Sequence, residues 1–319
     1  MSMSSGGLPV RTLGRTGLQV TQLGYGAMEL RSAPRGPGVD DERAEQVLRA
    51  VLDSGINYID TSIDYGLSEE RIGATLSARR SEFYLASKCG CPVNPPPGER
   101  GEHVFTRDNV VAGVEQSLRR LRTDYLDVVQ FHASPSKSTL EQEGGLEALL
   151  DLQRQGKVRF VGISGTVPNL PEQIRMGVFD VFQIPYSALQ PEHEELISAA
   201  AAAGGGTVIR GGVIKGALAP DKQGVAPRDL AGEPRQLWDQ AQLDDLLDGA
   251  SHNEFVLRYT LSHPDMHTTI VGTANLEHLA ANVAAARNGA LPADVYAEAK
   301  RRLEVVKAAV HQRARPANA

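Results

Sequence analysis

The sequence predicts a (β/α)8 barrel that forms a single domain over residues 1–319. Eight short runs rich in Val, Ile, Phe and Tyr recur along the chain, and segments with helical spacing of apolar residues separate them. A length of 319 residues with 41% hydrophobic residues suffices for one large core. A doubly wound sheet is the alternative, but its G-x-G-x-x-G pattern is reduced here to the G-x-G of Gly24–Gly26.

The expected strands follow one another at regular intervals. They occupy residues 21–28, 56–62, 83–88, 126–132, 159–164, 181–187, 207–213 and 268–273. Before the first of them, the segment VRTLGRTGLQVTQLG predicts a β-hairpin that turns around Gly14–Gly17. Such a hairpin would close the bottom of the barrel.

The segments between the strands predict helices at 40–55, 106–122, 144–157 and 191–205. In the second of these, one apolar stripe is formed by Val110, Val114, Leu118 and Leu121. Glycines that suit a left-handed C-cap end three of the helices, at Gly55, Gly156 and Gly204.

Two connections are longer than usual, at residues 90–105 and 214–251. Both follow strands, so we expect them at the carboxyl-terminal face, where barrel enzymes build their sites. The second should contain a short helix around Trp238–Leu247. Its tryptophan either lines a substrate pocket or packs the insert, and the sequence leaves both open.

Composition excludes several classes of function. The net charge is −6 without a basic block, which argues against nucleic acid as a partner. No apolar run is long enough to cross a bilayer, and MSMSSGGLPV lacks the build of a signal peptide. We therefore expect a cytoplasmic protein, monomeric by default, whose partner is a small molecule.

The chain has two cysteines, Cys89 and Cys91. On extended chain their Cα atoms would lie roughly 6.5–7 Å apart, at the outer limit for a disulfide. With His103 they could form half a metal site, but a closed zinc site needs about four ligands and no second pair has suitable spacing. We expect two free thiols and no metal.

Four polar residues at or just beyond strand ends carry the chemistry: Asp60, Tyr65, Lys88 and His132. A tyrosine near a lysine has its phenolate favoured and its pKa lowered. Asp60 can pair with Lys88 and hold it, and His132 can donate to a substrate oxygen. Together they predict a general acid for a carbonyl, or a base for an alcohol.

These residues lie in a sequence that resembles the aldo-keto reductase family over nearly its whole length. The matching segments are LGRTGLQVTQLGYGAM, GINYIDTSIDYGLSEERIG, LASKCG, SLRRLRTDYLDVVQFH, GKVRFVGISG, FQIPYS and VGTANLEHLAANVAAA. The resemblance implies a (β/α)8 barrel with NAD(P)H bound extended across its top. It also implies that Tyr65 protonates a carbonyl oxygen as hydride reaches the carbon, with aldehydes, ketones or aldoses as substrates.

The resemblance assigns the nicotinamide end of the cofactor to three further positions. Ser164 and Gln183 match residues that hold the carboxamide, and Asp60 also matches a ribose contact. Gly165 stands where the usual residue is Asn, so one hydrogen bond should be missing. Gly26 and Ala27, near the end of the first expected strand, are two further expected contacts with the cofactor.

The segment GGVIKGAL is assigned to the pyrophosphate, with Lys215 as its phosphate contact and Gly211 and Val213 as further cofactor contacts. Arg210, just before this segment, is also an expected cofactor contact. Arg210 replaces an aromatic residue that many members place under the nicotinamide. Its guanidinium either stacks on the ring, where its charge would disfavour the oxidised cofactor, or turns outward to a phosphate or carboxylate.

The adenosine end is assigned to Gly272, Thr273, Asn275, His278 and Asn282. Residues 275–283 should open a helix whose amino-terminal amides favour an anion. Many NADPH-dependent members have Lys and Arg in place of Gly272 and His278. We expect NADP(H), in only slight preference to NAD(H).

A second hypothesis is a redox-sensing or accessory protein that holds NADP(H) and turns over slowly. A third, a barrel enzyme with metal chemistry, lacks ligand clusters in the sequence. Single-turnover hydride transfer to a panel of aldehydes separates the first two.

Overall fold

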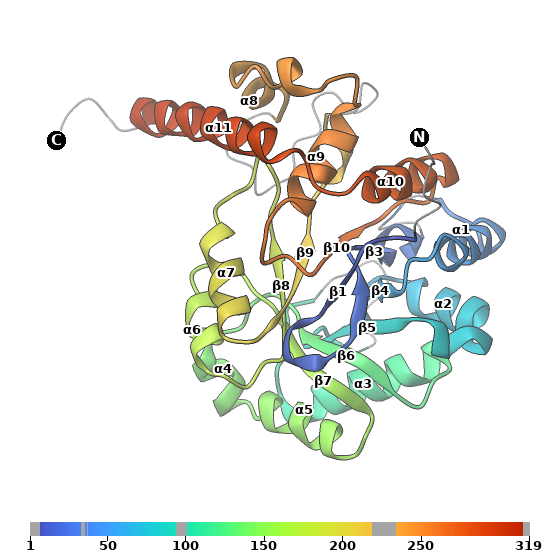
Figure 1. Ribbon diagram of the computed structural model, residues 1–319. Helices are drawn as coiled ribbons and strands as arrows, with labels where there is room; N and C mark the ends of the chain where they lie inside the picture. Colours follow the sequence, from blue (N-terminus) through green and yellow to red (C-terminus); the bar gives the residue numbers. More distant parts are fainter. Residues whose placement is uncertain (1–6, 33–35, 37, 94–100, 219–233, 315–319) are drawn as a thin grey trace.

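A computed structural model describes residues 7–32, 36, 38–93, 101–218 and 234–314, and in it eight parallel strands close into a barrel (Figure 1). The order around the barrel is β10-β3-β4-β5-β6-β7-β8-β9, so the predicted fold class is confirmed. The strands are β3 Leu23–Gly26, β4 Tyr58–Asp60, β5 Tyr84–Cys89, β6 Leu126–Phe131, β7 Val158–Ser164, β8 Val181–Pro185, β9 Gly206–Arg210 and β10 Thr268–Val271. All eight lie within or beside the predicted runs.

The predicted hairpin is also present, as β1 Val10–Thr12 paired antiparallel with β2 Gln19–Thr21. Its tip carries Leu13, which packs with Leu18, Val20 and the first residues of several barrel strands. A Cβ on Gly14 would lie 2.3 Å from the backbone nitrogen of Gly206, so the turn fits the start of β9 only with glycine. The hairpin therefore closes the amino-terminal end of the barrel.

Helices surround the barrel, as Figure 1 shows. The α-helices are α1 Asp41–Asp53, α2 Ser68–Leu76, α3 Arg107–Leu121, α4 Lys137–Gln142, α5 Gly145–Arg154, α6 Leu170–Arg175, α7 Glu194–Ala202, α8 Pro234–Gln240, α9 His252–Leu261, α10 Leu276–Asn288 and α11 Ala293–Ala314. Short 3-10 helices lie at η1 Gly14–Thr16, η2 Ala27–Arg31, η3 Ser77–Glu82, η4 Ile214–Gly216 and η6 Leu243–Leu246.

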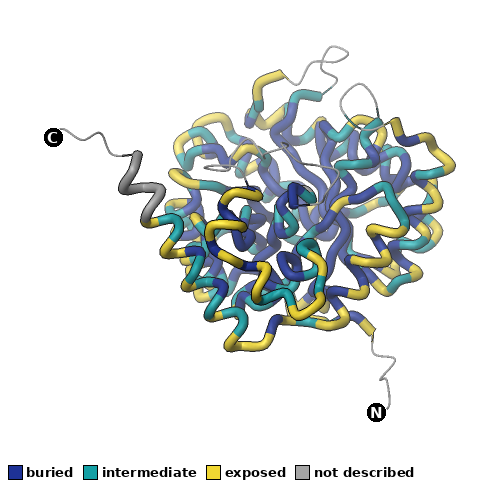
Figure 2. Tube along the Cα trace, turned by 90° about the horizontal axis from the view of Figure 1, so that it is seen from above, coloured by how far each residue is buried: buried dark blue, intermediate teal, exposed yellow. Residues whose placement is uncertain are grey.

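The four predicted helices correspond to α1, α3, α5 and α7, and their ends follow the expected chemistry. Gly55, Gly156 and Gly204 all have left-handed φ angles, of 93°, 77° and 80°. The predicted stripe of α3 is buried against the barrel, as Figure 2 illustrates for the inner faces of the helical layer. None of the helices among the described residues is long and apolar enough to cross a membrane.

The insert after β9 differs from its prediction. Instead of one helix around Trp238–Leu247, α8 ends at Gln240 and a separate 3-10 turn follows at Leu243–Leu246. Gln242 breaks the helix because its backbone is left-handed, with φ of 50°. Trp238 is fully buried against Phe255 and donates to Asp244, which supports packing of the insert rather than a pocket wall.

Strand register places five expected site residues, together with Gln130, at one end of the barrel. Gly26 pairs with Asp60, Lys88 with Gln130, and Ser164 with Gln183. All lie at or within two residues of the carboxyl-terminal ends of their strands. Parallel strands thus bring residues far apart in the sequence into one ring.

Candidate active site

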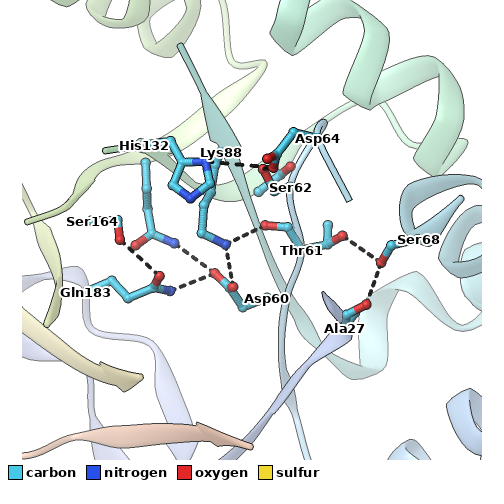
Figure 3. A network of polar contacts seen from close by, with 12 residues as sticks. Ala27, Asp60, Thr61, Ser62, Asp64, Ser68, Lys88, His132, Ser164 and Gln183 are labelled. Atoms are coloured by element: carbon cyan, nitrogen blue, oxygen red, sulfur yellow. Dashed lines mark hydrogen bonds and ion pairs between the residues drawn. The ribbon is translucent and has the colours of Figure 1, made fainter. Parts of the chain in front are cut away.

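The centre of this ring is a buried ion pair (Figure 3). Lys88 Nζ donates to Asp60 Oδ1 at 2.6 Å and to the carbonyl of Thr61 at 2.7 Å. Both side chains are at most 2% exposed. Burial alone would lower the pKa of Lys88, but Asp60 and Tyr65 outweigh it, and the pKa is raised. Lys88 is therefore a fixed ammonium group at neutral pH.

The second oxygen of Asp60 is held by two amides. Oδ2 accepts from Gln130 Nε2 at 3.0 Å and from Gln183 Nε2 at 2.9 Å. Three donors therefore fix one carboxylate in a single orientation. Gln130 was not among the residues predicted from the sequence, because an amide within an apolar strand looks like an ordinary core position.

Tyr65 follows β4 and lies directly over this pair. Lys88 Nζ is 4.8 Å from the centroid of its ring. Burial raises the pKa of Tyr65, and the opposing influence of Lys88 is too small to bring it below its usual value. Lys88 acts in the expected direction, but desolvation of the phenolate dominates, so the pKa is raised and not lowered as the sequence suggested.

His132 follows β6 and meets Tyr65 edge to face, with ring centroids 6.3 Å apart. Its Nδ1 lies 3.1 Å from Cys91 Sγ and 3.7 Å from Asp64 Oδ1. Figure 3 shows the contact with Asp64. These contacts hold Nδ1, so the ring is oriented by protein groups.

The two cysteines have different surroundings. Neither forms a disulfide, as expected, and both are buried. Cys89 lies in the apolar core and burial raises the pKa of its thiol. Gly90, with φ of 87°, turns the chain between them, so that only Cys91 joins His103 and His132.

The predicted nicotinamide contacts Ser164, Gly165 and Gln183 lie close together. Ser164 donates to Gln183 Oε1 at 3.2 Å, and the amide of Gly165 donates to the carbonyl of Gln183 at 3.0 Å. A Cβ on Gly165 would lie 2.7 Å from both Gln173 and Leu170. An Asn at this position would require the side-chain ends of Gln173 and Leu170 to move.

The next predicted cofactor contacts lie at the ends of β3 and β9. Ala27 is buried, and its carbonyl accepts from Ser68. Arg210 ends β9 and Gly211 follows it with φ of 76°. Burial lowers the pKa of His193, and the positive charge of Arg210 lowers it further. Val213 lies just before η4, and the side chain of Lys215 lies outside the described residues.

The predicted adenosine end surrounds the start of α10. A Cβ on Gly272 would lie 2.5 Å from the carbonyl of Gly26, so β10 and β3 approach too closely for a side chain. Thr273 is buried and its carbonyl accepts from Tyr25, while Asn282 accepts from Asn253.

The helix predicted over 275–283 is present as α10, but its first amides are already bonded. Asn275 accepts from the amides of Glu277 and His278 as an N-cap, which leaves fewer donors for an anion than the sequence suggested. Arg43, which no sequence pattern singled out, donates from Nε to the carbonyl of Ala274 at 3.0 Å. It brings a cation to this end of the site.

Comparison with known proteins agrees with this geometry. The sequence pattern described as "Aldo/keto reductase family" matches residues 22–304. The chain belongs to the aldo/keto reductase family. It is 27% identical to the uncharacterized oxidoreductase YqkF of Bacillus subtilis over 86% of this chain and 90% of that one. It is 28% identical to L-galactose dehydrogenase of Arabidopsis thaliana over 87% and 88% of the two chains.

A similar solved structure is the holo form of the aldo-keto reductase AKR11C1 from Bacillus halodurans. It shares 28% identity and a TM-score of 0.78 over 94% of this chain and 96% of that one. As a member of the family, the protein is an oxidoreductase that acts on C=O and CH–OH groups. The family uses nicotinamide cofactors.

Proposed function

We propose that the protein reduces small aldehydes with NAD(P)H, and that Tyr65 supplies the proton to the carbonyl oxygen. The observation that carries this proposal is the position of Lys88 Nζ, bonded to Asp60 and 4.8 Å from the ring of Tyr65. A fixed ammonium at this distance stabilises negative charge as it develops on the phenol. Its position does not vary, because Asp60 is itself held by Gln130 and Gln183.

The protonation state of Tyr65 suits its proposed role as proton donor in carbonyl reduction. With its pKa raised, Tyr65 carries its proton at neutral pH and is ready to donate it. Oxidation of an alcohol would require the phenolate, which burial disfavours. Reduction near neutral pH therefore starts from the form of Tyr65 that already holds its proton, while the net direction follows the ratios of cofactor and substrate.

His132 acts as the second donor to the substrate oxygen. Because Cys91 and Asp64 engage Nδ1, Nε2 is the ring nitrogen that serves the substrate. Two donors that converge on one oxygen orient the carbonyl and polarise it.

The cofactor fits the donor set at the carboxyl-terminal face. Ser164 and Gln183 offer a hydroxyl and an amide, which match a carboxamide, and Gly272 leaves backbone exposed where a side chain would not fit. When bound there, the nicotinamide supplies the hydride. The protein's own residues hold the carbonyl and deliver the proton.

Two variants test this assignment, Tyr65→Phe and Lys88→Met. The matched control for the first is Tyr84→Phe at the start of β5, and the matched control for the second is Lys137→Met on α4. Each test variant should lower single-turnover hydride transfer by about 100- to 10,000-fold while binding of NAD(P)H is retained. Full transfer by both test variants would refute the mechanism. If the wild type itself binds the cofactor but transfers no hydride to any aldehyde, the protein is a cofactor-binding sensor instead.

We propose NADP(H) as the preferred cofactor, with Arg43 in place of the cations that are missing at Gly272 and His278. Its guanidinium lies beside Ala274, in the segment assigned to the adenosine end. Arg43→Gln should weaken NADPH binding about tenfold or more and leave NADH binding nearly unchanged. Arg49→Gln, an exposed change on the same helix, is the control. Tighter binding of NADH than NADPH by the wild type would overturn the preference.

The aldehyde panel should include aldoses. Two relatives are named as an L-galactose dehydrogenase and a D-threo-aldose 1-dehydrogenase. Reduction of open-chain aldehydes, with slower oxidation of aldoses, is the expected pattern. The cytoplasmic location and monomeric state remain predictions.

A further inference from the structure

A cluster of three metal-ligating side chains lies beside the proposed reductase site. Cys91, His103 and His132 each offer one ligand atom, and these atoms all lie within 4.8 Å of one another. The residues come from three places: Cys91 lies two residues after β5, His103 lies in the segment before α3, and His132 directly follows β6. We propose that they bind one thiophilic divalent cation, with Zn²⁺ as the preferred ion.

The spacing is close to what zinc needs. Tetrahedral zinc binds sulfur at about 2.3 Å and imidazole nitrogen at about 2.0–2.1 Å, which sets ligand atoms roughly 3.3–3.7 Å apart. Cys91 Sγ and His132 Nδ1 are already 3.1 Å apart. The ring of His103 stands edge to face with that of His132, with centroids 5.2 Å apart. Since the three ligand atoms lie within 4.8 Å of one another, they must move slightly closer together when the ion binds.

The backbone already holds these ligands together. The amide of Val104 donates to the carbonyl of Gly90 at 2.8 Å, and Asn109 Nδ2 donates to the carbonyls of Cys91 and Val104 at 3.0 and 2.8 Å. The two arms of the loop that carry Cys91 and His103 are thereby fixed side by side. A pre-organised site loses less conformational entropy when an ion binds.

The chemistry of the donors selects the ion. One thiolate and two imidazoles favour Zn²⁺ over Mg²⁺ or Ca²⁺, which require oxygen ligands. Asp64, 3.7 Å from the Nδ1 of His132, adds negative charge beside the cation. Three protein ligands leave the fourth tetrahedral position to water or another small ligand. Because His132 belongs to both sites, metal occupancy and the orientation of the substrate-binding imidazole are linked.

The test is direct metal binding to the full-length, reduced protein, without cofactor or substrate. Co²⁺ is the optical probe, because a bound thiolate gives a sulfur-to-cobalt charge-transfer band, and the chain has only two cysteines. Zn²⁺ should displace Co²⁺ at one equivalent per chain. Cys91→Ser should abolish the band, and His103→Gln should lower Zn²⁺ affinity by at least about 100-fold, more than outer-shell partners contribute.

Cys89→Ser is the matched control, since it removes the neighbouring thiol that lies in the apolar core. It should retain the band and one equivalent of Zn²⁺. Absence of a band in the wild type, its loss in Cys89→Ser, or unchanged Zn²⁺ affinity in His103→Gln would each overturn the proposal. Far-ultraviolet circular dichroism verifies that each variant is folded. Since no turnover is measured, failure of the proposed reductase activity would not alter this result.

Discussion

The pair of Asp60 and Lys88 should show strong coupling in stability, which can be measured without any assumption about function. In Asp60→Asn the ammonium of Lys88 loses its counter-charge at 1–2% exposure. Both oxygens of Asp60 accept hydrogen bonds from donors, one from Lys88 and the other from Gln130 and Gln183. The NH₂ group introduced by asparagine must therefore face one of these donors, which costs a hydrogen bond. Removing one partner of a buried pair costs about 3–5 kcal/mol, and we expect the free energy of unfolding to fall by that amount.

The double variant Asp60→Asn with Lys88→Met should recover much of this loss. Methionine fills the volume of the lysine without a charge, and the carboxamide oxygen introduced at position 60 can then accept from both Gln130 and Gln183. We expect a coupling energy of about 2–3 kcal/mol between the two positions, at the upper end of values for residues in contact. Urea unfolding followed by circular dichroism measures all four proteins of the cycle.

Additivity of the two single changes to within about 0.5 kcal/mol would refute this reasoning. So would a loss of less than about 1 kcal/mol in Asp60→Asn, since it would mean that water or a rearranged side chain compensates Lys88. Glu82→Gln, at an exposed ion pair with Arg79, is the control and should leave the free energy of unfolding nearly unchanged.

Three further predictions concern packing and charge. Gly73→Ala should destabilise the protein by about 1–3 kcal/mol, because the added Cβ would lie 2.1 Å from the carbonyl oxygen of Arg120. The control is Gly38→Ala, which should be neutral because nothing lies within 4 Å of its added Cβ. The midpoints of urea unfolding measure both effects. Burial raises the pKa of Glu69 above 4.5, so the native state binds its proton more tightly and stability falls as pH rises through that range. Relative to the wild type, Glu69→Gln should therefore gain stability from pH 4.5 upward in thermal unfolding, and a constant difference would contradict this. Burial lowers the pKa of Lys307 to about 8, so between pH 8 and 10.5 the unfolded state binds more protons and stability rises with pH. Lys307→Met should lack that rise, and equal pH profiles for the two proteins would contradict the prediction.

The barrel could be predicted from the sequence because its signals are local. Each strand lies in a short run rich in apolar residues, and glycines with left-handed backbone end the helices where they were expected. The insert was predicted less well for a physical reason. Residues 238–247 have helical composition, but the left-handed Gln242 divides them, and no glycine or proline at that position marks the break.

The strand-end residues of the candidate site could be found by position, whereas their energetics could not. The sequence places Lys88 near Tyr65, which suggests a lowered pKa. How deeply the phenol is buried depends on the neighbours that cover it, and in the folded protein burial prevails. Gln130 and Arg43 were missed for a similar reason, since their importance lies in partners on other strands and helices.

The cysteines show where sequence spacing misleads most. Cys89-x-Cys91 looks like one unit, but the left-handed Gly90 sends the two thiols into different surroundings. The ligands that Cys91 actually meets, His103 and His132, lie 12 and 41 residues further along the chain. Only the pairing of β5 with β6 and the closed loop at Asn109 bring them together. Such a metal site depends on segments that meet at the end of the barrel. A family member can therefore have one without a recognisable metal-binding motif in its sequence.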